Sequence, residues 1–391
     1  MTGSVVVFGA TGFTGELVAR ALVRRGASPV LAGRNPERLA SLSAQLGGLE
    51  TRTGDVNRPD TVYELVEAGD VVVSTVGPFV RRGRPAVDAA VRAGATYLDS
   101  TGEPPFVREV LGRDGDRAAQ TGALLLPAFG YDYVPGNLAG ALALRAAGEA
   151  ASRLTVAYFV TGRSGLGALS GGTLASVVGL AGQPSFAFRC GRLVTERPAS
   201  RVGRVPVRGR SASGVSVGGT EHVGLPRLYA GLCEVEVLLG WAGRASRAAQ
   251  LATQVVQGLD RPLRRFAPGV ADGLVTGLAY AAGRWQGPDA GNRSRAGTLV
   301  VAVAADEGGR PLARAEVTGP EPYTLTGELL AWAALESTGR TAPHGRPAAG
   351  ALTPVEAFGL DRLAEGCESL GLVTTSVRER AEARASRDPR W

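Results

Sequence analysis

Three glycines and one arginine near the N-terminus have the types and spacing of a nucleotide-binding turn. Gly9, Gly12 and Gly15 recur every third residue, and Arg34 follows further along the chain. Glycine lets the backbone approach a pyrophosphate, whose charge is stabilised at a helix N-terminus. Arginine at the end of the next strand suits a ribose 2′-phosphate, whereas an NAD site would carry Asp or Glu there. We therefore expect NADPH binding by Gly9, Thr11, Gly12, Phe13, Thr14, Gly15 and Arg34.

The segments around this turn have the periodicity of strands and a helix. Residues 4–8 are an apolar, β-branched run typical of a buried parallel strand. Apolar residues recur at helical spacing over 17–22, and residues 29–32 form a second apolar run. In a chain with 56 glycines, a glycine triplet alone could be a packing turn. The order strand, turn, helix, strand and arginine makes a dinucleotide site the better interpretation.

Strands and helices are predicted to alternate up to about residue 130, as in a doubly wound α/β sheet. Further strands are expected at 50–53, 70–74, 96–99 and 124–126, with helices at 36–47, 59–68, 85–93 and 105–120. Asn35 is a predicted N-cap before Pro36. Ligands of such sheets bind outside the carboxyl ends of the strands. Those ends carry the other expected cofactor contacts, which are Asp55, Ser74, Thr75, Val76, Gly77, Pro78, Gly102 and Glu103.

Candidate proton donors follow the strand at 124–126. Hydride transfer from a nicotinamide needs orientation and a proton donor for the atom that becomes anionic. Tyr133 is the first choice, because a neutral phenol can donate at pH 7 without a shifted pKa. Tyr131 and Asp132 are the other catalytic candidates. Packing of Tyr133 against the second domain, and capping of a turn by Asp132, are the structural alternatives.

The pattern changes after about residue 135, and a second, α+β domain is expected there. Strands are predicted at 154–159, 185–188, 233–238 and 298–304, the last in a hairpin with 313–318. Helices are predicted at 171–181, 244–258 and 325–336, and residues 196–220 are expected to be a mobile loop beside an exposed His222. Hydroxyls and backbone N–H groups of Ser170, Gly171, Gly172 and Thr173 are expected to meet the substrate carbonyl, with N-capping as the alternative.

Three units are predicted along the chain: an NADP-binding domain over 1–135, a substrate or dimerisation domain over 136–344, and a C-terminal part over 345–391. In the last, a helix over 354–371 is expected to return to the first domain, and a basic tail follows it. An apolar face of the second-domain sheet is a candidate homodimer interface.

Composition excludes several kinds of chemistry. The chain has no lysine, so Schiff-base, pyridoxal phosphate and Tyr-Lys dyad mechanisms are excluded, and two histidines are too few for a multi-histidine metal centre. The net charge is +7, but the arginines are scattered without interleaved aromatic residues, so nucleic acid is not an expected partner. Three widely spaced cysteines, an N-terminus that runs straight into a strand and short apolar runs predict a cytoplasmic protein without membrane insertion.

Seven motifs in order resemble the saccharopine dehydrogenase-like family, in particular its actinobacterial branch of trans-acting enoyl reductases. They lie at 9–15, 32–34, 74–79, 97–103, 130–135, 170–173 and 350–354. The resemblance implies a Rossmann domain, an inserted α+β domain and a C-terminal segment that folds back. It also implies reduction of a C=C bond in a polyketide- or lipid-type substrate. Tyr133 departs from the small residue that this branch is expected to carry there.

These observations predict an NADPH-dependent reductase of an activated double bond, an enoyl or enone C=C. The substrate is expected to be a small molecule of polyketide, lipid or other secondary metabolism, free or held on a carrier protein. A ketone or imine reductase remains an alternative within enzymes. A sensor that binds NADP without turnover, and a Rossmann protein recruited for non-redox cyclisation, are alternatives of other classes.

Overall fold

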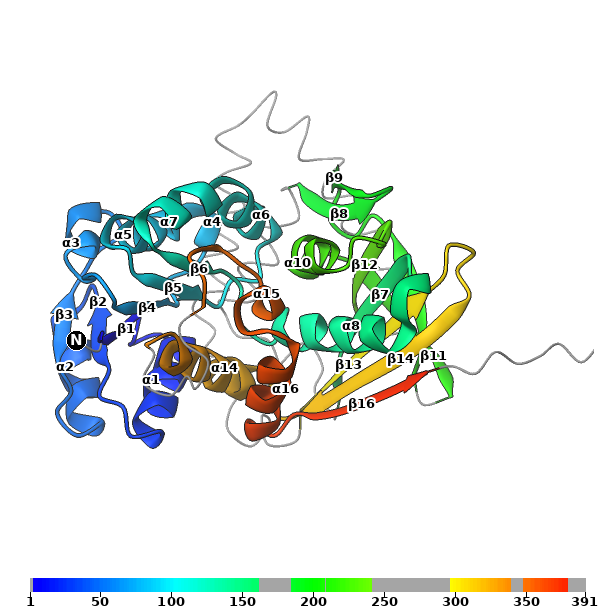
Figure 1. Cartoon of the computed structure of the whole chain (residues 1–391). Helices are drawn as coiled ribbons and strands as arrows, with labels where there is room; N and C mark the ends of the chain where they lie inside the picture. Colours follow the sequence, from blue (N-terminus) through cyan, green and yellow to red (C-terminus); the bar gives the residue numbers. More distant parts are fainter. Residues whose placement is uncertain (1–2, 162–183, 208, 241–295, 339–346, 379–391) are drawn as a thin grey trace, which may run out of the picture.

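Two β-sheets lie side by side with helices between them (Figure 1). The computed structural model describes residues 3–161, 184–207, 209–240, 296–338 and 347–378. The helices predicted at 171–181 and 244–258, and most of the basic tail, lie outside these residues. In the described part, no helix is long and apolar enough to cross a bilayer, and no group of His, Cys, Asp and Glu could hold a metal ion.

The first sheet is parallel and confirms the predicted doubly wound arrangement. Its order is β15-β6-β5-β4-β1-β2-β3, so the order reverses at the pair β1 and β4. The strands are β1 (Val5–Phe8), β2 (Val30–Gly33), β3 (Thr51–Thr53), β4 (Val71–Ser74), β5 (Thr96–Asp99), β6 (Leu124–Leu126) and β15 (Gly350–Ala351). A crevice for a ligand is expected where the carboxyl ends of β1 and β4 diverge.

Helices cover both faces of this sheet because its strands are apolar on both sides. Val5 and Val7 face one core together with Leu22, whereas Val6 and Phe8 face the other. The helices are α1 (Phe13–Arg24), α2 (Pro36–Gln45), α3 (Pro59–Tyr63), α4 (Phe79–Arg82), α5 (Arg84–Ala93), α6 (Pro104–Arg113), α7 (Gly115–Thr121) and α14 (Pro322–Ser337). The predicted cap is confirmed, since Asn35 Oδ1 accepts a hydrogen bond from the Arg38 N–H at 2.9 Å.

Two of the helices predicted for the first domain differ in extent. The helix expected over 59–68 ends at Tyr63, and the one expected over 105–120 is divided into α6 and α7 at Asp114. Asp114 adjoins both helices and its side chain has no exposed surface. The break therefore places a buried carboxylate between two helices, where sequence periodicity indicated a single one.

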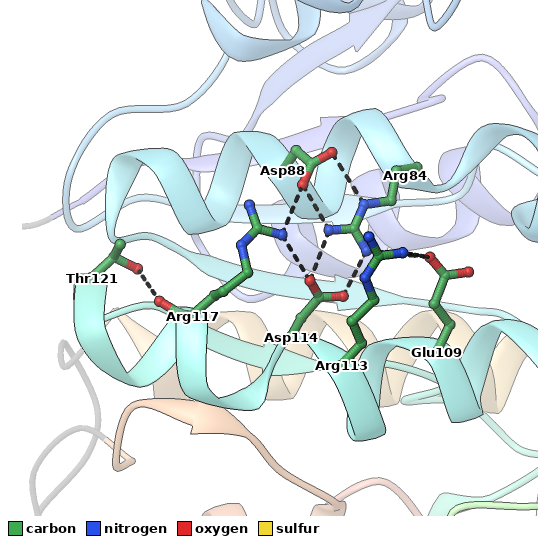
Figure 2. Close-up of polar contacts among 7 residues, drawn as sticks. All are labelled: Arg84, Asp88, Glu109, Arg113, Asp114, Arg117 and Thr121. Atoms are coloured by element: carbon green, nitrogen blue, oxygen red, sulfur yellow. Dashed lines mark hydrogen bonds and ion pairs between the residues drawn. The ribbon is translucent and has the colours of Figure 1, made fainter.

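A cluster of charged side chains joins α5 to the junction of α6 and α7 (Figure 2). Arg84 makes a bidentate pair with Asp114, with distances of 2.6 and 2.7 Å, and also contacts both oxygens of Asp88. Arg117 reaches Asp114 Oδ1 at 2.9 Å from the other side. Because Asp114 is buried, these arginines compensate the cost of removing its charge from water. Arg113, by contrast, is 72% exposed and lies 3.8 Å from Glu109.

The second sheet is mixed and mostly antiparallel, as expected. Its main path among the described residues is β10-β11-β12-β7-β13-β14-β16, with β8 paired to β12 and to β9. The strands are β7 (Arg153–Thr161), β8 (Ser185–Arg189), β9 (Arg192–Glu196), β10 (Val202–Val207), β11 (Arg210–Ser216), β12 (Glu234–Leu239), β13 (Gly297–Ala305), β14 (Pro311–Gly319) and β16 (Val373–Arg378). The predicted hairpin of β13 and β14 is confirmed.

Residues 196–220, expected to be a mobile loop, contain the antiparallel hairpin of β10 and β11. The Gly, Ser and Arg content that favoured a loop belongs to a half-exposed hairpin, which turns at Gly209 with a φ of +74°. Val205 is buried and packs with Leu238 of β12. His222 was also expected to be exposed, but it is 2% exposed within α10 (Glu221–Leu228).

Helices α8 (Val134–Ala147), α10, α15 (Pro354–Phe358) and α16 (Leu360–Ser369) lie between the two sheets (Figure 1). The helix predicted over 354–371 is broken at Gly359, whose φ of +73° favours glycine. The C-terminal segment contributes to both sheets, because β15 pairs with β6 and β16 pairs with β14. The motif at 350–354 therefore begins in the edge strand of the first sheet, next to β6.

Candidate functional site

The glycine turn between β1 and α1 has the geometry of an anion cradle. Gly9 has a φ of +89°, and a Cβ on Gly15 would lie 2.2 Å from the Gly9 carbonyl oxygen. Gly12 is the N-cap of α1 and supplies no capping side chain, so the first N–H groups of the helix have no side-chain acceptor of that kind. These features fit a pyrophosphate, which needs close backbone approach and a helix N-terminus.

Two arginines flank the turn. Arg34 follows β2, is exposed, and makes no ion pair or hydrogen bond within the described part of the chain. Arg38, in the first turn of α2, donates from Nη2 to the carbonyl oxygen of Thr11 at 3.0 Å. Arg34 is thus free to meet a 2′-phosphate, and Arg38 holds the glycine turn. The sequence reading did not single out Arg38, although its position three residues after the N-cap Asn35 places it on the first turn of α2.

Other predicted cofactor contacts have partners within the protein. Asp55 Oδ1 accepts hydrogen bonds from the backbone and side-chain nitrogens of Asn57, at 2.9 and 3.1 Å. Thr75 Oγ1 donates to the β1 end, with the Phe8 and Gly9 carbonyl oxygens at 3.1 and 3.2 Å. The Thr75 side chain therefore ties the loop after β4 to the glycine turn. Of the remaining predicted contacts, Thr14, Val76 and Pro78 are partly exposed and Gly77 is exposed, whereas Ser74 is fully buried.

Two buried carboxylates tie the loop after β5 to its neighbours, Glu103 to the loop after β4 and Asp99 to the loop after β6. Glu103 caps α4, accepting from the Phe79 N–H at 2.9 Å and the Val80 N–H at 3.0 Å. Asp99 Oδ1 accepts from the backbone N–H groups of Thr101 and Ala128, both at 2.8 Å. Burial raises the pKa of Asp99 to about 6. Sequence reasoning missed Asp99, although its place as the last residue of a strand was a usable signal.

The three catalytic candidates after β6 lie in different surroundings. Tyr131 Oη donates to the Phe159 carbonyl oxygen at 3.2 Å, and Tyr133 Oη donates to the Gly218 carbonyl oxygen at 3.4 Å. The Tyr133 phenol is 2% exposed, and burial raises its pKa well above the ordinary value. Both phenols thus reach toward the second domain.

Asp132 is the half-buried member of this segment and lies beside the loop after β5. A Cβ on Gly102 would be 3.2 Å from Asp132 Oδ2. The Asp132 carboxyl makes no hydrogen bond to any described residue, and burial raises its pKa to about 6. A carboxyl group with this pKa can release a proton near neutral pH. The Asp132 carboxyl group therefore lies beside the loop after β5, in surroundings that favour its protonated form.

A further carboxyl group, absent from the sequence prediction, lies behind Asp132. Glu221 begins α10 with no exposed surface, and Tyr158 Oη of β7 donates to its Oε1. The neighbouring His222 is neutral near pH 7, because burial lowers its pKa to about 3. Gly218, Gly219 and Thr220 before Glu221 were a signal for a helix start, but nothing in the local sequence indicated burial. Ser170, Gly171, Gly172 and Thr173 lie outside the described residues.

Comparison with known proteins identifies relatives of the first domain and of the whole fold. Residues 5–126 match the family model described as the saccharopine dehydrogenase NADP binding domain. The apo form of saccharopine dehydrogenase (L-Glu forming) from Saccharomyces cerevisiae superposes with a TM-score of 0.57, over 96% of this chain and 100% of that one. Sequence identity to it is 13%, so this likeness shows a shared fold.

Curated relatives share part of the chain at higher identity. A Mycobacterium tuberculosis protein provisionally named a trans-acting enoyl reductase is 40% identical over 181 residues, which are 44% of this chain and 43% of that protein. A Mycobacterium ulcerans protein named trans-acting enoyl reductase is 39% identical over 140 residues, which are 34% of each chain. The matches thus span less than half the length of these relatives.

One conclusion about the first domain follows from its glycine turn, its parallel sheet and the residues matched by the family model. The domain that contains Gly9 and Arg34 is of an NADP-binding type. Residues 5–126 are therefore similar to the NADP-binding domain of saccharopine dehydrogenases, and the fold of the chain is that of a saccharopine dehydrogenase.

Proposed function

We propose that the protein is an NADPH-dependent reductase of a C=C bond conjugated to a carbonyl group, acting on a polyketide- or lipid-type substrate. The names of its mycobacterial relatives support enoyl reduction. The absence of lysine from the chain is consistent with this choice, because hydride addition to an enone needs no amine nucleophile. The substrate is a small molecule, free or carried on a carrier protein.

The cofactor is held by the glycine turn and Arg34. The first N–H groups of α1 bind the pyrophosphate, Arg34 binds the 2′-phosphate, and the loop from Thr75 to Pro78 lines the ribose and nicotinamide. When bound, NADPH supplies the hydride. Arg38 keeps the turn in its binding conformation through the Thr11 carbonyl.

The position and chemistry of Asp132 carry the reductase proposal. Its half-buried carboxyl group lies beside Gly102, at the strand ends where the nicotinamide half of the cofactor is expected. Addition of a hydride to the β-carbon moves the C=C electron pair onto the α-carbon and the carbonyl oxygen. A proton from Asp132 then completes the saturated product. Tyr133 stays a candidate, but its hydroxyl is engaged by the Gly218 carbonyl.

The cofactor assignment is tested by calorimetric titration of NADPH and NADH into wild type and Arg34→Ala. We expect NADPH to bind the variant about 10- to 100-fold more weakly, because a charged hydrogen bond contributes about 1.5–3 kcal/mol. NADH, which lacks the 2′-phosphate, should bind both proteins equally and serves as the internal control. Equal loss for both nucleotides would mean that Arg34 acts on folding rather than on the phosphate.

A screen of acceptors separates the reductase from its alternatives. NADPH oxidation should be seen with α,β-unsaturated thioesters or ketones. Oxidation only with saturated ketones or imines would move the assignment to those substrates. Tight NADPH binding without turnover of any acceptor would favour a sensor.

A further inference from the structure

The Glu221 carboxyl group occupies a site that two glycines keep open. A Cβ on Gly136, in the first turn of α8, would lie 2.4 Å from Glu221 Oε1 and 1.8 Å from Tyr158 Oη. A Cβ on Gly219 would lie 2.4 Å from Glu221 Oε2. Any larger residue at either position would displace the carboxyl group. The backbone therefore closes on Glu221 from both sides.

Glu221 connects three elements that meet behind the site. It starts α10, accepts the Tyr158 hydroxyl of β7 on Oε1, and lies against the first turn of α8 through Gly136. The N-cap of α8 is Tyr133, so the residue before it, Asp132, leads directly into this turn. The Tyr131 and Tyr158 rings also meet edge to face, with centroids 5.8 Å apart. Displacement of Tyr158 would thus disturb both ends of the segment that carries Asp132.

Acidic and phenolic groups lie around Glu221, and no ion pair joins it to an arginine of the described segments. Oε2 has no hydrogen-bond partner among the described residues. Burial raises the pKa of Glu221 to about 8, and the nearby charge of Asp132 adds to this effect. The titratable groups that interact with it are Asp132, Tyr133 and Tyr158. The Tyr131 ring contacts Tyr158 edge to face, and the next residue along the chain, the neutral His222, lies near Arg189. This raised pKa favours the carboxylic acid form of Glu221 at neutral pH.

We propose that Glu221, in its neutral form, is a positioning residue that holds Tyr158 against the first turn of α8 and so fixes Asp132 at the strand ends. Its catalytic consequence rests on the proposed function. Ionisation of Glu221 places a second negative charge near Asp132 in a buried space. Glu221 then no longer holds Tyr158 against the first turn of α8. The site then has two acidic groups whose protonated forms are needed, Asp132 to donate a proton and Glu221 to hold the donor in place.

The first test compares the thermal stability of wild type and Glu221→Gln from pH 5 to pH 9. Glutamine keeps an acceptor for the Tyr158 hydroxyl and cannot ionise. Because the folded-state pKa is raised, the wild type loses stability relative to the variant as pH rises from the ordinary glutamate pKa to about 8. The difference in melting temperature, variant minus wild type, should grow by several degrees over this range and then level off. A difference that is constant from pH 5 to pH 9 would overturn the proposal.

The second test is the pH profile of kcat/KM for enone reduction. In wild type the logarithm should fall with slope −1 above about pH 6, as Asp132 ionises, and with slope −2 above about pH 8. Glu221→Gln should keep most of the activity and slope −1 throughout. A variant inactive at all pH values would show that Glu221 transfers the proton itself, against a positioning role. An unchanged slope of −2 in the variant would show that a group other than Glu221 ionises near pH 8, and would also overturn the proposal.

Tyr158→Phe provides an independent variant, because it removes the held hydroxyl and keeps the ring. We expect kcat to fall about tenfold while the Kd for NADPH is unchanged, since the cofactor site lies on other elements. Full activity in Tyr158→Phe would contradict a positioning role of Glu221 through the Tyr158 hydroxyl. If the wild type reduces no enone at all, the proposed function fails, whereas the thermal comparison still decides whether Glu221 is held neutral.

Discussion

Asp132→Asn should lower kcat for enone reduction by about 10²- to 10⁴-fold, the range expected for loss of a positioned general acid. Asparagine has nearly the same shape as aspartate, and Asp132 makes no hydrogen bond to a described residue that would be lost. The fold and the NADPH affinity should therefore be unchanged. Stopped-flow measurement of NADPH oxidation, with the Kd from calorimetry, separates the chemical step from binding.

The sign of the pH dependence follows from the same group. Burial raises the pKa of Asp132 to about 6, so the proton-donating form is lost as pH rises through 6 and the rate falls. Tyr133→Phe is the matched control, because the Tyr133 hydroxyl already donates to the Gly218 carbonyl oxygen. This substitution should lower kcat by less than about tenfold. A large loss in Tyr133→Phe with a near-normal Asp132→Asn would transfer the donor role to Tyr133.

Arg84→Met should lower the free energy of unfolding by about 3 kcal/mol, because it leaves a buried carboxylate with half of its partners. Asp114 has no exposed surface and receives both terminal nitrogens of Arg84, while Arg117 remains on its other side (Figure 2). Methionine retains much of the apolar stem. Urea unfolding monitored by tryptophan fluorescence gives the difference.

Arg113→Gln is the control for this cluster. Its guanidinium is 72% exposed and 3.8 Å from Glu109, so its removal should change stability by less than about 0.5 kcal/mol. Equal effects of the two substitutions would show that the cluster acts as a solvated surface network. Asp114→Asn combined with Arg84→Met should recover part of the loss, since the uncompensated charge is then gone.

The first sheet was predictable because each strand carries its own signal. Apolar runs such as Val71–Ser74 end at loops rich in Gly and Pro, and the cap at Asn35 marks the next helix. In a parallel sheet these local patterns also bring the strand ends together, so the placement of Asp132 near Gly102 follows from topology. The roles of Glu103 and Asp55 could not be predicted, because carboxylates at strand ends can bind ligands or cap turns.

The second sheet was harder to predict because its pairing joins distant segments. The β10 and β11 hairpin is half exposed, so its composition is that of a loop and only cross-strand pairing reveals it. The burial of Glu221 likewise could not be predicted from the local sequence. Its neighbours Tyr158 and Gly136 are far away in sequence, and burial of a glutamate is unexpected without them.

The most direct test of the reductase assignment is isotope transfer from NADPH deuterated at the nicotinamide C4 to an α,β-unsaturated thioester, in ordinary water. We expect deuterium at the β-carbon of the saturated product, from one face of the cofactor, and a solvent-derived proton at the α-carbon. Run in D2O with unlabelled NADPH, the labels should be reversed. Deuterium on a carbinol carbon, or a cofactor that retains its label in the presence of every acceptor, would contradict enoyl reduction.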